Sequence, residues 1–290
     1  MSAGARVGAA AGAAVGAGAL PGVYVEGVGL WAPRLPGWEL ARAVLRGEVP
    51  APQPRLARPS PSILPPTERR RCPDSVAVAL EVAQAACVHA RRDPAHLPSV
   101  FASTHGDLAI TDYMCATLAQ APTMISPTRF HHSVHNAAAG YWSIATGCLA
   151  PYTAIAAWEY TFAEALLAAV VQVCAGEGAV LLVAYDIEAC GPLATVAASR
   201  GVLGAALVLT AAATVGSCAR LRLRTVPGAG VESRARAPNA ALVQGNAMAA
   251  CLPLLEALAD ERPRSLHHAL GPALAMALEL EPLTARQAAG

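Results

Sequence analysis

The chain has 290 residues, of which 54% are hydrophobic and only 14% are charged, a composition that can bury one sizeable core or one core with a small appendage. Its net charge of +1 excludes the strongly basic surface typical of nucleic-acid-binding proteins. The longest apolar run, residues 163–175, is shorter than the roughly 20 residues of a membrane helix, so no membrane span is expected.

The first elements in chain order are a tail, a strand and a helix. Residues 1–22 are almost all Ala and Gly and predict a disordered tail. Residues 23–31 alternate apolar and small side chains and predict a strand, and residues 38–46 predict a short helix. Residues 50–66 are rich in proline and predict a loop. Residues 74–91 carry apolar side chains at helical spacing and predict a long helix.

The middle of the chain contains shorter segments. Residues 99–103 predict a strand, residues 111–121 a helix and residues 125–127 a turn. The histidine-containing segment that follows, residues 131–135, is expected to be extended. Residues 136–146 predict a helix that ends at a glycine.

The next three elements are predicted to form the centre of the fold. Residues 152–157 and 179–185 are expected to be central strands, because the second is continuously apolar and therefore typical of a strand buried on both faces. Residues 162–175 predict the buried helix between them. The remaining elements are strands at 204–212 and 219–226, a loop at 228–238, a helix at 242–259 that Pro253 kinks, and one or two strands at 269–280. This alternation predicts a layered α/β fold.

The chain has eight cysteines, and their spacing contains no CxxC pair and no metal-type pattern. Scattered single cysteines of this kind are typical of reduced core residues. They therefore indicate a cytoplasmic protein, and we expect no metal and no cofactor.

The most informative signal is a series of short motifs. In order, they are Ile-Ser-Pro at 125–127, Ser-Val-His-Asn at 133–136, Ala-Gly at 139–140, Ile144, Gly147, Pro151 and Ala-Ile-Ala at 154–156. In this order and spacing they resemble the run that leads to the nucleophile of β-ketoacyl synthases. In that family a buried strand delivers a cysteine to the tip of a helix, where backbone N–H groups lower the pKa of the thiol and stabilise an oxyanion. Glu159, between Trp158 and Tyr160, stands where the cysteine is expected.

The resemblance extends over roughly 200 residues, from the first strand to the one that ends at residue 226. Over this range the chain resembles the β-ketoacyl synthase-like N-terminal domain family, whose short members belong to aryl-polyene and related fatty-acid-like pathways. The family implies a thiolase-like layered α/β fold with one complete half, residues 23–226. Residues 227–290 are then a shortened C-terminal segment that packs on the same core.

The chemistry that the family uses is incomplete here. A condensing enzyme needs a thiolate that carries the acyl chain and two histidines that assist decarboxylation. Glutamate cannot form the thioester, and the only histidines after His135 are His267 and His268, which lie in no family motif. The resemblance therefore implies no catalytic residue in this chain.

Other side chains are weaker candidates. Cys148 and Cys174 lack a nearby histidine in the pattern of a nucleophile. His131, His132 and His135 are expected to be hydrogen-bonded loop residues rather than metal ligands, since the segment is predicted to be extended. His105, near Asp107, is expected to belong to a turn.

Three hypotheses follow. The first is a non-catalytic, chain-length-factor-like subunit that pairs with an active ketosynthase. The second is an enzyme in which Glu159 acts as acid or base, for example in decarboxylating a malonyl carrier. The third is a scaffold remnant that binds no acyl ligand.

The first hypothesis makes a specific prediction about surfaces. In family dimers, the strand before the nucleophile pairs across the two-fold axis, so residues 125–159 are expected to meet the ketosynthase. Phe130, Tyr141 and Trp158 are expected to be anchors, since aromatic side chains dominate such contacts. The interface or tunnel residues implied by the family are Phe130, His135, Asn136, Tyr141, Trp158 and Glu159. An acyl carrier protein is the second partner that the family implies.

Overall fold

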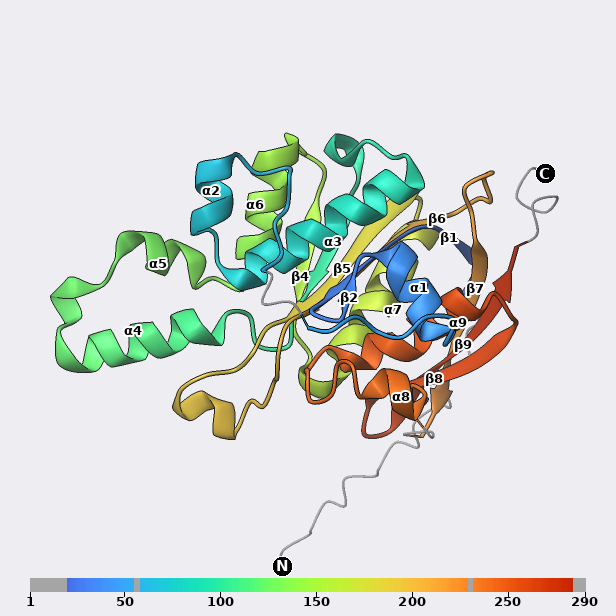
Figure 1. Ribbon diagram of the computed structural model, residues 1–290. Helices are drawn as coiled ribbons and strands as arrows, with labels where there is room; N and C mark the ends of the chain where they lie inside the picture. The colour runs from blue at the N-terminus through green and yellow to red at the C-terminus, as the bar shows by residue number, and fades with distance from the viewer. Residues whose placement is uncertain (1–19, 55–57, 229–231, 284–290) are drawn as a thin grey trace, which may run out of the picture.

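The computed structural model describes residues 20–54, 58–228 and 232–283. Residues 1–19 of the predicted tail lie outside the described residues. The described residues form one mixed nine-stranded sheet with helices on both faces (Figure 1). The strands are β1 (Val23–Ala32), β2 (Leu35–Pro36), β3 (Ser99–Ala102), β4 (Tyr152–Ile155), β5 (Ala179–Asp186), β6 (Leu203–Thr210), β7 (Ala219–Pro227), β8 (Arg264–Gly271) and β9 (Leu274–Pro282).

The order across the sheet is β4-β3-β5-β6-β1-β7-β9-β8, and β2 pairs with β1. Strand β3 runs parallel to both β4 and β5, whereas the pairs β5–β6, β6–β1, β1–β7, β7–β9 and β8–β9 are antiparallel. The sheet therefore has a short parallel region at one side and a long antiparallel region at the other. The predicted α/β class is confirmed.

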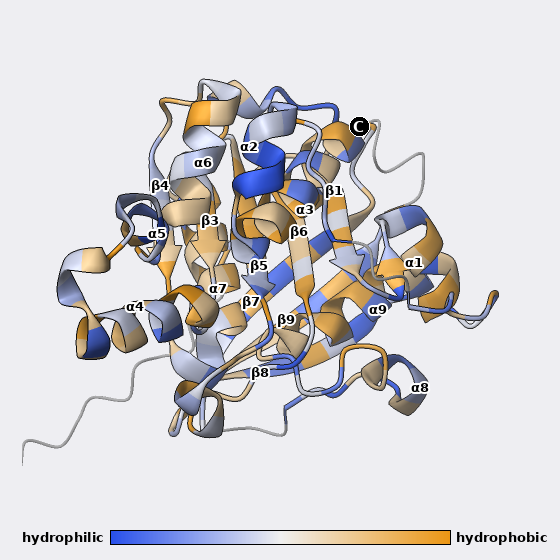
Figure 2. Cartoon of the chain, turned by 60° about the vertical axis from the view of Figure 1, so that its left-hand side comes forward, coloured by the Kyte–Doolittle hydropathy of each residue, from blue (hydrophilic) through white to orange (hydrophobic). Residues whose placement is uncertain are grey.

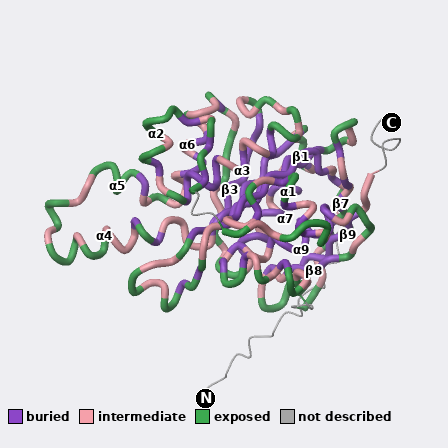
Figure 3. The backbone as a smooth tube through the Cα atoms, viewed as in Figure 1, coloured by how far each residue is buried: buried purple, intermediate pink, exposed green. Residues whose placement is uncertain are grey.

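Two apolar clusters cover the two faces of this sheet. The α-helices of the described residues are α1 (Trp38–Leu45), α2 (Pro66–Arg71), α3 (Asp74–Ala90), α4 (Leu108–Gln120), α5 (Pro127–His132), α6 (Ala137–Thr146), α7 (Thr161–Cys174), α8 (Ala237–Ala240) and α9 (Leu252–Asp260). Helices α3 and α6 pack on one face, and α1, α7 and α9 pack on the other. Strands β5 and β6 between them are buried along their whole length, as Figure 3 shows.

Helix α3 lies very close to the sheet because glycines face it. A Cβ at Gly27 or Gly29 would overlap the backbone oxygens of Ala86 and Val82. This close approach requires glycine on β1, since any other residue would push helix and sheet apart. Trp142 of α6 lies in the same cluster as α3 and is almost fully buried.

The structure corrects three expectations. Residues 152–157 were expected to form a central strand, but β4 is the edge strand, since it pairs only with β3 and its residues are exposed or half-buried. Residues 131–135 were expected to be extended, but α5 reaches His132 because the Ser126 side chain accepts a hydrogen bond from Arg129 N and so caps the helix. Pro253 does not kink a helix, since it lies in the first turn of α9.

Other elements agree with the sequence. The continuous apolar strand at 179–185 is central and buried, and residues 269–280 belong to the hairpin β8–β9. Arg220, Arg222 and Arg224 alternate along one face of β7, where Arg222 pairs with Glu281 of β9. Figure 2 shows hydrophilic and hydrophobic residues alternating along these strands. This face of the antiparallel region is therefore polar.

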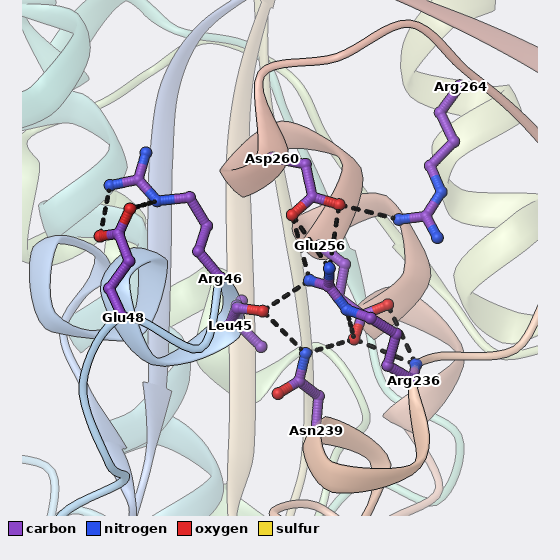
Figure 4. Close-up of polar contacts among 8 residues, drawn as sticks. All are labelled: Leu45, Arg46, Glu48, Arg236, Asn239, Glu256, Asp260 and Arg264. Carbon is purple, nitrogen blue, oxygen red and sulfur yellow. Dashed lines mark hydrogen bonds and ion pairs between the residues drawn. The ribbon is translucent and has the colours of Figure 1, made fainter.

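The C-terminal segment is joined to the core by a buried polar network (Figure 4). The carboxylate of Glu256, which is inaccessible to solvent, accepts hydrogen bonds from Arg236 N at 3.1 Å and from Asn239 Nδ2. The Arg236 guanidinium also pairs with Asp260 at 3.1 Å and donates to Leu45 O of α1. This network fixes residues 236–260 against α1.

Candidate active-site region and partner surface

The parallel strands bring polar residues together at one end of the sheet. Ser103, Thr104 and His105 follow β3, Trp158 and Glu159 follow β4, and Asp186 ends β5. Because β3 is parallel to both neighbours, the carboxyl ends of all three strands meet at the same edge. Ligand sites of α/β sheets form at such edges. This group of residues is therefore the candidate active-site region.

Asp186 holds the loop after β3 in place. Its buried carboxylate accepts hydrogen bonds from Ser103 Oγ at 2.7 Å and from Thr104 N at 3.0 Å. Burial raises the pKa of Asp186, and these hydrogen bonds act in the opposite direction. The carboxylate thus accepts hydrogen bonds from donors of this loop that would otherwise be buried without a partner. Asp186 is not among the site residues predicted from the sequence, although an acidic residue at the end of a fully apolar strand is a usable signal.

The turn after β4 is strained and well fixed. Trp158 has φ of 52°, a left-handed conformation that is unusual for a bulky residue. Thr161, the first residue of α7, accepts a hydrogen bond from Ala157 N at 2.9 Å and donates one to Trp158 O at 2.6 Å. A nucleophile elbow places its reactive residue on a strained strand-to-helix turn of this kind. In this chain the strained residue is Trp158, one position before Glu159.

Neither elbow side chain is buried. Trp158 is 57% exposed, and its ring lies edge-on to that of His105 with centroids 5.4 Å apart. Glu159 is also exposed, because the turn η3 (Trp158–Tyr160) follows an edge strand. A hydrogen bond to Glu159 raises the pKa of Tyr160. The Glu159 side chain thus lies in solvent.

A cavity of about 390 Å³ adjoins the elbow. Glu159 lines it together with Glu232 and Arg234 from the C-terminal segment and with small apolar residues that include Ala247 and Ala250. Burial, and secondarily the charge of Glu159, raises the pKa of Glu232. The C-terminal segment therefore supplies one wall of the elbow cavity.

Two of the three clustered histidines, His132 and His135, have hydrogen-bond partners. His135 Nε2 donates to Ser103 O at 2.8 Å, and His132 Nε2 lies 2.7 Å from the Tyr141 hydroxyl. Burial lowers the pKa of His132. Across residues 20–54, 58–228 and 232–283, no three His, Cys, Asp or Glu residues lie close enough to hold a metal ion. His132 and His135 are therefore hydrogen-bonded, as predicted.

A second surface, beside β4, exposes apolar side chains. Ile144 on α6 is 82% exposed, and Leu149 in the loop between α6 and β4 is 97% exposed. Phe130 of α5 and Tyr152 of β4 are also exposed. We call Ile144, Leu149 and Tyr152, together with the outer edge of β4, the β4 surface. Exposed apolar patches on folded proteins usually mark interfaces.

The β4 surface also contains a cavity of about 660 Å³. Its lining includes Tyr141, Ile144 and Tyr152, and Glu68 lies at the side of α2. Asn136, which also lines it, donates to the Tyr152 hydroxyl at 3.0 Å. The six residues expected at an interface or tunnel thus lie in different places. Asn136 and Tyr141 line the cavity of the β4 surface, and Phe130 is exposed on α5. His135, Trp158 and Glu159 lie at or near the elbow.

His268 is buried, which no local pattern of the sequence predicted. It is 1% exposed, its ring lies edge-on to that of Phe162 with centroids 5.6 Å apart, and neither ring nitrogen has a hydrogen-bond partner among the described residues. Burial, and secondarily the charge of His267, lowers the pKa of His268 to about 4. His268 is therefore neutral at pH 7, and it packs against α7 just after the elbow.

Comparison with known proteins gives a consistent result. The sequence-family model of the β-ketoacyl synthase N-terminal domain matches residues 46–272 of this chain. No curated protein sequence matches the chain. In the described part of the chain, no helix is long and apolar enough to cross a membrane.

Three solved structures share the fold. The first, a ketosynthase (ApeO) in complex with its chain length factor (ApeC) from Xenorhabdus doucetiae, has a TM-score of 0.67 and 21% identity, over 88% of this chain and 98% of that chain. The ishigamide ketosynthase/chain length factor has a TM-score of 0.66 and 16% identity, over 90% and 99%. A type II polyketide acyl-carrier protein in complex with its ketosynthase (AntDE:AntF) has a TM-score of 0.69 and 12% identity, over 91% and 100%. The predicted thiolase-like fold is confirmed.

Proposed function

Because the chain belongs to the β-ketoacyl synthase N-terminal domain family, we propose that it is a non-catalytic, chain-length-factor-like subunit that pairs with an active ketosynthase in fatty-acid or polyene type biosynthesis. The observation that carries the proposal is the elbow itself. The turn keeps the strained geometry of a nucleophile elbow, but its residues Trp158, Glu159 and Tyr160 include no thiol. A subunit of this kind has the ketosynthase fold but cannot form the thioester with the acyl chain.

The β4 surface supports the pairing. Strand β4 has no partner on its outer edge among the described residues, and unpaired strand edges readily accept another strand. Ile144 and Leu149 lie beside this edge with most of their surface in solvent. We propose that the ketosynthase binds here, with Phe130 and Tyr141 as anchors. Two of the three similar structures are described as ketosynthase and chain length factor complexes.

The elbow makes the enzymatic alternative weaker. An acid or base in malonyl-carrier decarboxylation should be shielded from water so that its pKa is shifted towards neutrality. Glu159 is solvated, and the buried His268 beyond Phe162 has no described partner. The scaffold alternative leaves the exposed β4 surface without a role. An acyl carrier protein as second partner and a cytoplasmic location complete the proposal.

Co-expression with the ketosynthase from the same gene neighbourhood tests the pairing. We expect a 1:1 complex in size-exclusion chromatography with light scattering. Ile144→Asp and Leu149→Asp should weaken it at least about tenfold, since each places a charge in an apolar contact. Val88→Asp, on the outer side of α3, is the matched control and should bind as wild type. A well-behaved monomer that binds no such ketosynthase would remove the proposal in favour of the scaffold.

A further inference from the structure

The connection between β5 and β6 is long for two neighbouring antiparallel strands. Such strands are commonly joined by about two to five residues, whereas residues 187–202 separate these two. We call residues 187–202 the strap. In Figure 1 the strap is the gold loop that projects below α4, and it contains the short helical turn η4 (Pro192–Thr195). Loops of this length inside a compact domain are usually functional.

Most of the strap lies at the surface and has no core of its own. Within it only Ile187, Ala197 and Ser199 are buried, and Val196 is 67% exposed. A backbone hydrogen bond from Ala189 N to Ser199 O, at 2.9 Å, joins its two sides. Segments with few buried apolar contacts open at a lower free-energy cost than the core of the same protein. The strap can therefore open while the sheet stays folded.

One buried side chain holds both ends of the strap. The Nδ2 atom of Asn246 donates to Arg200 O at 3.0 Å and to Gly201 O at 3.3 Å. The same atom lies 3.2 Å from Asp186 O, at the other end of the strap. Asn246 Oδ1 accepts a hydrogen bond from Met248 N at 3.0 Å, which orients the amide. Both ends of the strap therefore depend on a single residue of the C-terminal segment.

The strap runs beside the candidate active-site region. It begins after Asp186, whose carboxylate holds the loop after β3. Further along, η4 contacts α4, and a Cβ at Gly191 would overlap the Asp112 carboxylate of that helix. Gly191 has φ of 64° and ψ of −165°, a conformation that is essentially restricted to glycine. The strap thus reaches from the end of β5 to α4, alongside residues 103–107, which join β3 to the same helix.

We infer that the strap is a lid of the candidate active-site region and that Asn246 is its latch, the residue whose hydrogen bonds keep the lid closed. The inference does not depend on the pairing with a ketosynthase. Loss of one buried amide frees both ends of the strap, while β5 and β6 stay joined by their own hydrogen bonds. Opening then gives solvent and ligands access to Asp186 and to the loop that it holds.

Hydrogen exchange of the full chain, followed by mass spectrometry, tests the inference. In the wild type, the amides of the strap should exchange at least about tenfold faster than those of the buried helix α3. Asn246→Ala should raise this ratio at least about a further tenfold, because it removes the donor that holds both ends. Asn239→Ala is the matched control, since Asn239 is as buried and its Nδ2 donates to Leu45 O at 3.0 Å, away from the strap. It should not raise the ratio.

A milder variant keeps the test decisive if Asn246→Ala does not fold. Ser199→Ala removes the side-chain oxygen that accepts a hydrogen bond from Ala247 N at 3.2 Å, and it should raise the ratio about threefold. Equal exchange in the strap and in α3 of the wild type would mean that the strap opens only with the whole domain, and would overturn the inference. An unchanged ratio in Asn246→Ala, or an equal rise in Asn239→Ala, would also overturn it, because Asn246 would then be no latch.

Discussion

The ring of His105 lies edge-on to that of Trp158, with centroids 5.4 Å apart, so the loop after β3 packs directly on the strained turn after β4. Asp186 fixes the first of these segments and Thr161 fixes the second. Strained residues persist only where their surroundings hold them, and they concentrate at functional sites. Trp158 is therefore the residue of this turn whose replacement should be most informative.

The first prediction concerns thiols placed at the elbow. The positive end of the α7 dipole lowers the pKa of a nearby thiol. Because Trp158 is the strained residue of the turn, the new thiol in Trp158→Cys should react with iodoacetamide at pH 7 about tenfold faster than the one in Glu159→Cys. Peptide mass mapping measures both rates, with the exposed native Cys115 as internal reference. A faster reaction in Glu159→Cys would place the elbow at 159 instead.

The second prediction is that the native chain accepts no acyl group. Burial raises the pKa of six of the eight thiols, namely Cys72, Cys87, Cys174, Cys190, Cys218 and Cys251. Cys148 is buried, with its Sγ 3.6 Å from Leu97 O, and Cys115 is exposed on α4, away from the elbow. Intact mass after incubation with an acyl carrier thioester should be unchanged, whereas the ketosynthase should gain an acyl group. A stable adduct on any cysteine would overturn the non-catalytic assignment.

The third prediction concerns pH. The pKa of His268 is about 4 in the folded chain, whereas a histidine exposed to water, as in the unfolded chain, has a pKa of 6.5. Between these values the unfolded chain binds more protons, so stability is fully present above pH 6.5 and is lost as the pH falls towards 4. The loss should reach about 3 kcal/mol. Urea midpoints at pH 7 and 4.5 measure it.

A pair of variants identifies the residue responsible. His268→Leu should reduce the difference between the two midpoints, because the leucine needs no proton in either state. His267→Leu, on the other face of β8, should keep the wild-type difference. Equal pH dependence in His268→Leu and wild type would assign the effect to other groups.

The fourth prediction concerns the network of Figure 4. Glu256→Ala leaves the Arg236 and Asn239 donors without their buried acceptor, and should cost about 3–5 kcal/mol in the free energy of unfolding. Glu281→Ala breaks a second Arg–Glu pair, to Arg222, but both side chains are nearly half exposed, so the cost should stay below about 1 kcal/mol. Chemical denaturation compares the two. Equal costs would show that the network does not fix the C-terminal segment.

Local patterns determined most elements of this protein. The continuous apolar run at 179–185 could satisfy its backbone and side chains only as a buried strand, and the helical spacing at 74–91 only as an amphipathic or buried helix. The order of motifs between 125 and 156 also identified the family, and the absence of a thiol at the elbow was visible directly. Each of these features is set by residues that lie close together in the sequence, so it can be predicted without the structure.

Only the tertiary structure decided where these elements stand. The sequence of β4 does not show that β3 is its sole partner, and this edge position exposes Glu159 and Trp158. Asp186 reaches Ser103 across 83 positions of the chain, and His268 meets Phe162 from a distant strand. Burial and pairing of this kind result from contacts between residues far apart in sequence, which no local pattern records.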